Sequence, residues 1–293
     1  MPPPTDASLK TTPTLVIEPP RGWIAVNFRE LWQYRELFGF LVWRDIKVKY
    51  KQTLLGAIWA ILVPLVQALI FTIIFSNVAG LSSDGLPPTL FFYIAMLIWT
   101  YFATSLTMSA NSLVGSSNLL TKIYFPRLIV PAGPCLAGLV DFAIGLIILV
   151  VMLIHYRFVP PATALLFPIF LALALITALG TGLFLSALNV KYRDIRFAVP
   201  FLIQMWMYVT VIISFTTIAQ WLEGHGIWPY LWGLNPLVAV VEGFRWCLVY
   251  PHTDPAIGPP WMLLAVGTPV ALVILFSGLF YFRRMEKQFA DII

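Results

Sequence analysis

The stretch LIVPAGPCLAGLVDFAIGLIILVVMLI, residues 128–154, decides the fold class of this protein. It contains one charged residue, Asp141, and its apolar residues run on without alternating with polar ones. About 20 consecutive apolar residues are enough for a helix to cross a hydrocarbon core about 30 Å thick. A continuous run indicates a helix and not a strand of a membrane barrel. This stretch therefore predicts a membrane-spanning helix.

Charged residues are so rare elsewhere in the chain that the gaps between them mark further spans. Of the 293 residues, 60% are hydrophobic and 11% are charged, whereas a soluble protein has about 25% charged residues. The sequence predicts an all-α integral membrane protein whose transmembrane domain covers residues 56–293. The six predicted transmembrane helices lie near residues 57–79, 89–111, 128–155, 162–189, 197–220 and 260–282.

A further apolar segment, residues 227–250, is expected to enter the membrane and return to the same side. Its Glu242 and Arg245 would be costly in a single lipid-facing helix. Asn235 followed by Pro236 is typical of a helix cap and the first helical residue. The sequence thus predicts an outer re-entrant helical hairpin at 227–250, before the last span. Glu242 and Arg245, three residues apart on its helix, can form an ion pair.

Basic residues are distributed unevenly along the chain. Of the 18 Lys and Arg residues, 16 lie in the N-terminal region, in the loops after the second and fourth spans and in the C-terminal tail. Because basic loops stay in the cytosol, both termini are predicted to be cytosolic. The net charge of +5 is then a topology signal, and nucleic-acid binding is not needed to explain it. No apolar run occurs in the first 30 residues, so we expect no cleavable signal peptide.

The N-terminal part divides into two predicted regions. Residues 1–20, rich in Pro and Thr, are expected to form a disordered tail. Residues 21–55 are expected to contain an amphipathic helix in the cytosolic interface, which either anchors the chain to lipid or also shapes a docking site for a partner. Its predicted apolar face consists of Leu31, Tyr34, Phe38, Leu41 and Val42, opposite Arg29, Glu36 and Arg44.

Three predicted spans carry aromatic or polar side chains at helical spacing. These are Gln67, Phe71 and Phe75 in the first span, Tyr93, Thr100, Thr104, Thr107 and Asn111 in the second, and Phe197, Phe201, Gln204, Tyr208 and Phe215 in the fifth. Polar groups of this kind usually hold helices together. Aromatic faces with few hydrogen-bonding groups also suit the flat faces of sugar rings. Both interpretations are open from the residues alone.

No residue pattern in this chain predicts catalysis. There is no G-x-x-x-x-G-K-[S/T] phosphate loop, and no metal-ligand cluster or catalytic set stands at a convincing spacing. Catalytic residues, metal sites and cofactors are therefore not expected here, and Cys135 and Cys247 are interpreted as packing residues. Asp141, in the middle of its span, indicates a functional residue by default. It is either part of a proton relay or hydrogen-bonded to a neighbouring helix.

Four segments together resemble the permeases of type-2 ABC exporters that handle O-antigen, capsule and teichoic acid polymers. The segments are FLVWRDIKVKYKQTLLG (40–56), NLLTKIYFPR (118–127), NVKYRDIRFAVPF (189–201) and LNPLVAVVEGFRW (234–246). They fall before the first span, in both inner loops and on the outer hairpin. The resemblance covers nearly the whole chain from about Leu31.

The resemblance implies a homodimer in the bacterial inner membrane, surrounded by membrane lipid and docked on two copies of a separate ATPase subunit. That subunit would bind the ATP and magnesium, and the substrate would be a lipid-linked polysaccharide. Residues 112–127 would form the coupling loop to the ATPase, with matching positions at Asn118, Lys122, Tyr124, Phe125 and Arg127.

The resemblance also implies roles for three further groups of residues. The interface helix and the inner rim would include Arg44, Asp45, Lys47, Lys49, Arg193 and Arg196. The outer gate would include Asn235, Pro236, Glu242 and Arg245. The polymer path would be lined by Phe71, Phe75, Tyr93, Thr100, Thr104, Phe197, Phe201, Gln204, Tyr208 and Phe215.

The chain departs from the family pattern in its fifth span. A proline usually follows the polar residue of that span, but here Thr210 is followed by Val211, and Phe215 by Thr216. The outer bend of this helix is therefore expected to be built differently. Two other classes of transporter stay open: a type-2 ABC exporter of drugs or lipids, and a proton-driven carrier that depends on Asp141.

Overall fold

The structure, a computed structural model, is helical throughout its described part. It describes residues 28–51, 53, 56–117, 119, 124–212, 214–222, 226–253, 258–286 and 288–289, and every regular element among them is a helix. The predicted all-α class is confirmed for these residues. The predicted tail (1–20) and residues 21–27 of the interface region lie outside the described residues.

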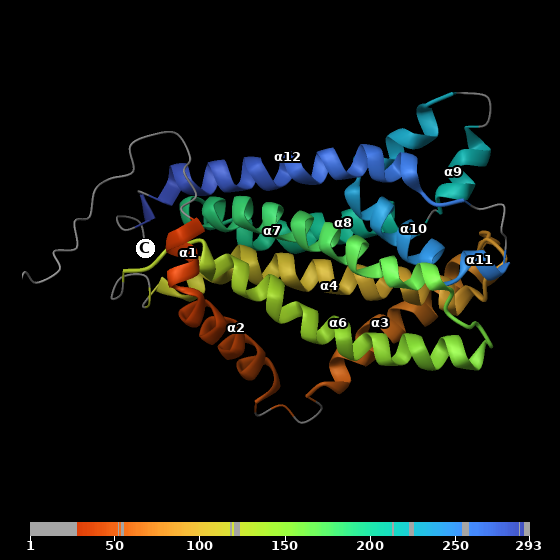
Figure 1. The fold of residues 1–293 in the computed structure, drawn as a ribbon, viewed down its shortest axis with the longest axis horizontal. Coiled ribbons are helices and arrows are strands. Elements are labelled where there is room, and N and C mark those ends of the chain that lie inside the picture. The colour runs from red at the N-terminus through yellow and green to blue at the C-terminus, as the bar shows by residue number, and fades with distance from the viewer. Residues whose placement is uncertain are drawn as a thin grey trace, which may run out of the picture.

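Five of the described helices are long and apolar enough to cross a membrane. They are α3 continued by η1 (Ile58–Phe71 and Thr72–Val78), α4 (Pro88–Gly115), α6 (Ile129–His155), η2 continued by α7 (Ala162–Leu166 and Phe167–Lys191) and α12 (Trp261–Glu286). Figure 1 shows α12, α7, α4 and α6 side by side along the long axis, with α3 crossing more obliquely. Five of the six predicted spans coincide with these helices.

Helix α4 forms the centre of the bundle. It contacts α3, α6, α7, α8 and α10, and 78% of its most apolar window is buried, against 17–28% in the other four long helices. It is also the least apolar of the five, with a mean hydropathy of 1.5 where the others have 2.3–2.8. The outer helices expose apolar side chains such as Ile73 and Val151, as expected for surfaces that face lipid.

Helices α7 and α12 cross at two glycines. A Cβ atom on Gly278 would lie 2.1 Å from the carbonyl oxygen of Gly180. A Cβ atom on Gly180 would lie 2.6 Å from the Cα of Leu275. Small residues at such crossings let two helix backbones approach closely, which is the usual way for helices to associate in lipid.

The predicted fifth span is interrupted. Helix α8 (Ile195–Val211) ends well before the predicted boundary, and a second helix, α9 (Phe215–Trp221), follows it. Ser214 directly precedes α9, and its hydroxyl accepts a hydrogen bond from the backbone N–H of Thr217 over 3.2 Å, as a helix-capping serine does. The predicted span at 197–220 is thus divided between α8 and α9, and the second helix begins after a capping serine without any proline. The count of six spans stays a prediction.

The segment 227–250 folds as a short helical hairpin. It consists of η3 (Trp228–Leu234) and α10 (Pro236–Leu248), followed by α11 (Tyr250–Thr253). The predicted cap is confirmed: the side chain of Asn235 accepts a hydrogen bond from the N–H of Leu237, and Pro236 is the first helical residue. Nearly all of α10 is buried against α7, α12 and α4.

The N-terminal helices α1 (Phe28–Gln33) and α2 (Arg35–Tyr50) lie at the end of the bundle where α12 also ends (Figure 1). The predicted inward face is partly confirmed, because Leu41 is buried and Phe38 packs beside it. The opposite face is less polar than expected. Phe40 and Trp43 on it are 62% and 60% exposed, so α2 presents apolar side chains on two sides.

Candidate functional site

Only part of the residues of the predicted coupling loop are among those described. Asn118 and Lys122 lie outside them. Tyr124 is 65% exposed and Phe125 is buried. Arg127 donates a hydrogen bond of 2.7 Å to the carbonyl oxygen of Glu286. This contact ties the start of α6 to the end of α12, so Arg127 faces its own chain while Tyr124 faces outward.

The predicted inner rim is a group of cations of different accessibility. Arg44 forms an ion pair of 2.8 Å with its neighbour Asp45. Arg193 and Lys47 are exposed, and the guanidinium of Arg196 lies 4.6 Å from the ring centroid of Phe197. A cavity of about 350 Å³ lies beside α2. It is lined by Phe40, Trp43, Arg44, Lys47, Val48 and Lys51.

Lys49 and Tyr50, at the end of α2, both contact Asp141 in the middle of α6. Lys49 forms an ion pair with one carboxylate oxygen, and the hydroxyl of Tyr50 donates a hydrogen bond to the other. Burial and this hydrogen bond raise the pKa of Tyr50, so its hydroxyl stays protonated and remains a donor. Asp141 is thus hydrogen-bonded to a neighbouring helix, which was one of the two alternatives. The sequence did not identify Lys49 or Tyr50 as its partners, because no periodicity links residues about 90 positions apart.

Asp141→Asn should leave intact most of the transport activity that the resemblance implies. The asparagine oxygen still accepts the hydrogen bond from Tyr50, and Lys49 is 36% exposed, so the lost ion pair is worth about 1 kcal/mol or less. The measurement is the transport rate per molecule of chain in the membrane. Asp141→Leu is the comparison, because it removes both contacts of α2 and should loosen that helix. Loss of all transport in Asp141→Asn at normal chain levels would instead favour a proton relay.

Aromatic side chains come together where the end of α3, with η1, lies beside α8. The rings of Phe71 and Phe75 lie 5.1 Å apart, and that of Tyr208 stacks on Phe71 at 6.4 Å. Along α8, Phe197, Phe201, Gln204 and Tyr208 are all exposed, which agrees with the predicted stripe.

Two predicted lining residues do not share this surface. Tyr93 is completely buried between α4 and α6, where its hydroxyl donates a hydrogen bond to the carbonyl oxygen of Gly145. Phe215 lies beyond the interruption and packs on Tyr230 at 5.7 Å. Thr100 and Thr104 are half-buried on α4, and Thr100 lies 3.5 Å from the amide oxygen of Gln67.

The predicted outer-gate residues lie in two groups of polar contacts, one around Glu242 and Arg245 and one around Asn235. Arg245 donates to Glu242 in an ion pair of 2.8 Å, and both side chains are buried. The guanidinium also lies 3.4 Å from the ring centroid of Phe91. Asn235 donates from its side-chain amide to the hydroxyl of Thr210 at 2.8 Å, which ties α10 to the end of α8.

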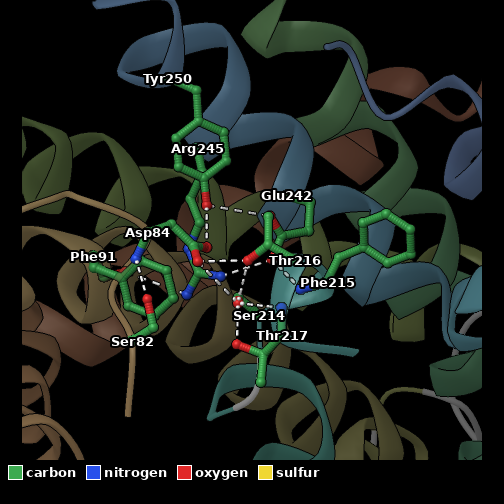
Figure 2. Close-up of polar contacts among 10 residues, drawn as sticks. All are labelled: Ser82, Asp84, Phe91, Ser214, Phe215, Thr216, Thr217, Glu242, Arg245 and Tyr250. Atoms are coloured by element: carbon green, nitrogen blue, oxygen red, sulfur yellow. Dashed lines mark hydrogen bonds and ion pairs between the residues drawn. The ribbon is translucent and has the colours of Figure 1, made fainter. Parts of the chain in front are cut away.

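The ion pair belongs to a larger polar cluster that sequence reasoning missed. Figure 2 shows Asp84 and Glu242 approaching the start of α9 from two directions. Asp84 accepts hydrogen bonds from the hydroxyls of Thr216 and Ser214, and from Tyr250 over 3.0 Å. The sequence did hold one signal, because Asp84 is the lone charge between the first two apolar runs. Among the described residues no group of His, Cys, Asp or Glu could hold a metal ion.

Comparisons with known proteins agree with this architecture. The chain is 29% identical to the O-antigen export system permease protein RfbA of Myxococcus xanthus over 264 residues, which cover 90% of this chain and 97% of the relative. Two proteins of the same name from Klebsiella pneumoniae are 24% and 25% identical over 251 residues, covering 85% of this chain and 92% of each relative. Residues 36–249 match the family described as ABC-2 type transporter. Because this match spans well over half of its residues, the chain belongs to the ABC-2 type transporter family.

Proposed function

We propose that this chain is the membrane subunit of an ATP-driven exporter that moves a polyprenyl-pyrophosphate-linked polysaccharide, an O-antigen, out of the cytosol across the inner membrane. The observation that carries the proposal is the similarity, along nearly the whole length, to permeases named for O-antigen export. Because the sequence carries no phosphate loop, the proposal assigns ATP binding to a separate subunit. In this proposal the chain works as a homodimer on two ATPase subunits, with both termini cytosolic.

The outward side of α2 supports a role in receiving the lipid-linked substrate. Its cavity combines the rings of Phe40 and Trp43 with the cations of Arg44, Lys47 and Lys51. Cations attract a pyrophosphate group by charge and by charge-assisted hydrogen bonds, while the aromatic rings suit the apolar start of a polyprenyl chain. The head group would bind here before the sugars enter the path.

The exposed rings of α8 support a path for the sugars. Phe197, Phe201 and Tyr208 follow one another on one side of the helix, and flat rings offer similar, weak stacking sites to successive sugar units. A conducting path needs binding that is favourable enough for entry and weak enough for release. The second subunit of the proposed homodimer would close this surface into a channel.

Purification of this chain from its native membranes in mild detergent tests the proposal. We expect a stoichiometric partner with a phosphate loop, and ATPase activity in the purified complex. A chain that purifies alone and without ATPase activity under several mild conditions would contradict the proposal. A complex that hydrolyses ATP and exports small molecules, with unchanged surface polysaccharide, would contradict only the proposed substrate.

Neutralising the inner rim should lower export and leave the complex assembled. In the variant with Lys47, Lys49, Arg193 and Arg196 all replaced by Ala, we expect export to fall by about tenfold or more, because each lost charge-assisted hydrogen bond is worth about 1.5 kcal/mol or more. The measurement is surface polysaccharide per molecule of chain, with ATPase activity as the check on assembly. A control variant, Arg157→Ala with Lys191→Ala, removes two cations outside this set. Unchanged export in the fourfold variant would refute the role of the inner rim.

A further inference from the structure

The polar cluster at the outer end includes a contact within one helix and contacts between elements. The pair of Glu242 and Arg245 lies within one helix, α10, and is buried. The contacts of Asp84 with Thr216 and Ser214 join the loop before α4 to the start of α9. A movement of α9 would break the contacts of Asp84 with Thr216 and Ser214 and leave the pair of Glu242 and Arg245 intact.

The apolar packing of α9 is thin compared with its polar contacts. Ile218 is its one buried hydrophobic side chain among those whose burial is described, and Trp221 at its end is 64% exposed. Phe215 shares a ring contact with Tyr230. Segments with few buried apolar contacts open at low free energy and supply the moving parts of proteins. The position of α9 therefore depends mainly on the polar contacts at its start.

Those contacts come from two carboxylates on different elements. Asp84 reaches the hydroxyls of Ser214 and Thr216, and Glu242 accepts a hydrogen bond of 3.2 Å from the N–H of Phe215. Arg245 donates to Glu242, whereas the donors that the structure shows for Asp84 among the described residues are the hydroxyls of Ser214, Thr216 and Tyr250. A carboxylate held by hydroxyls is released more easily than one held by a buried guanidinium. Asp84 is thus the releasable side of the cluster.

We propose that Asp84 is a positioning residue for export: its carboxylate holds α9 in the closed position of the outer gate. The gate opens when Ser214 and Thr216 leave Asp84, while Glu242 and Arg245 stay together on α10. This inference rests on the proposed function, because it assigns a moving part to the proposed exporter. The interruption at the start of α9 is the hinge at which the outer end of the fifth segment turns.

A cysteine probe on α9 tests this inference in cells that produce the chain with its native partners. Ile218→Cys places a thiol where the side chain is 7% exposed, and the native Cys135 and Cys247 are buried. With Asp84→Ala added, we expect a membrane-impermeant maleimide to label the probe about tenfold faster. Asp84→Asn keeps one acceptor oxygen and should give a smaller increase.

We call the contacts of Asp84 with Ser214 and Thr216 the lock. Two further variants distinguish the loss of the lock from a general disturbance of the loop. Ser83→Ala removes a hydrogen bond from Ser83 to the carbonyl oxygen of Leu86 in the same loop and should leave the labelling rate unchanged. Thr216→Val removes one of the two contacts of α9 with Asp84 and keeps the shape of the side chain, while Ser214 still donates to Asp84. It should accelerate labelling less than Asp84→Ala does. The double variant should label no faster than Asp84→Ala alone, because Thr216 acts through Asp84.

The outcomes distinguish this inference from the proposed function. Equal labelling rates with and without Asp84→Ala, or equal acceleration by Ser83→Ala, would overturn the role of Asp84 even if the parent chain exports polysaccharide. Faster labelling in Asp84→Ala and in Thr216→Val supports the lock. If those two variants also lower export at unchanged chain levels, the lock acts in transport. A parent chain with no polysaccharide export would refute the proposed function and leave the lock as a property of the fold.

Discussion

Replacing Arg245 by methionine should lower the free energy of unfolding by about 3–5 kcal/mol, because it leaves the carboxylate of Glu242 buried without its cation. Both side chains are almost fully shielded, with 1% and 6% of their surfaces exposed. The guanidinium also contacts the ring and the carbonyl oxygen of Phe91, so its loss also loosens the contact between α10 and α4. The measurement is the midpoint of thermal unfolding in detergent.

The double variant Arg245→Met with Glu242→Gln is the matched control. It removes both charges of the pair, and replacing a buried ion pair as a whole costs much less than removing one partner. We therefore expect the double variant to unfold at a higher temperature than Arg245→Met alone. A double variant that is less stable than the single one would show that the charge of Glu242 is not the source of the destabilisation.

Replacing Gly278 by valine should destabilise the bundle by about 3 kcal/mol or more, because the new side chain would overlap the backbone of α7. Its Cβ alone would stand 2.1 Å from the carbonyl oxygen of Gly180 and 3.0 Å from the adjoining carbon. Backbone atoms in a helix cannot move aside as a flexible side chain can, so α7 and α12 must separate. Thermal unfolding and the yield of monodisperse protein in detergent measure the effect.

Gly39→Val is the control for this prediction. Gly39 also lies inside a helix, α2, but no atom stands within 4 Å of a Cβ built there. Valine is at least as good a helix former as glycine, so we expect little change in stability. Equal losses in both variants would refute close packing as the reason for glycine at position 278.

The features that the sequence predicted correctly depend on local or compositional signals. Long apolar runs between rare charges located the helices α3, α4, α6, α7 and α12. The dipeptide at Asn235 and Pro236 located the start of α10, because capping needs only neighbouring residues. The pairing of Glu242 with Arg245 followed from helical spacing in the same way.

The features that it missed depend on contacts between distant segments. Asp141 finds its partners on α2, and Asp84 finds its partners on α9 and α11, and neither contact leaves a periodic trace. Tyr93 fitted a polar stripe on its helix, but the packing of α6 against α4 buries it. The bend of the fifth span was expected to be built differently, but the sequence did not indicate that the helix stops at Val211 and starts again after Ser214.

The central place of α4 bears on how the chain enters the membrane during synthesis. Insertion of a helix is favoured by its apolar side chains and opposed by its polar ones, and α4 has the lowest mean hydropathy of the five long helices, 1.5. The helices that flank it in the chain, α3 and α6, have values of 2.5 and 2.8 and are better suited to partition into lipid on their own. We therefore expect the stable insertion of α4 to depend more than that of its neighbours on contacts with other helices, and α6, against which it packs, follows it in the chain.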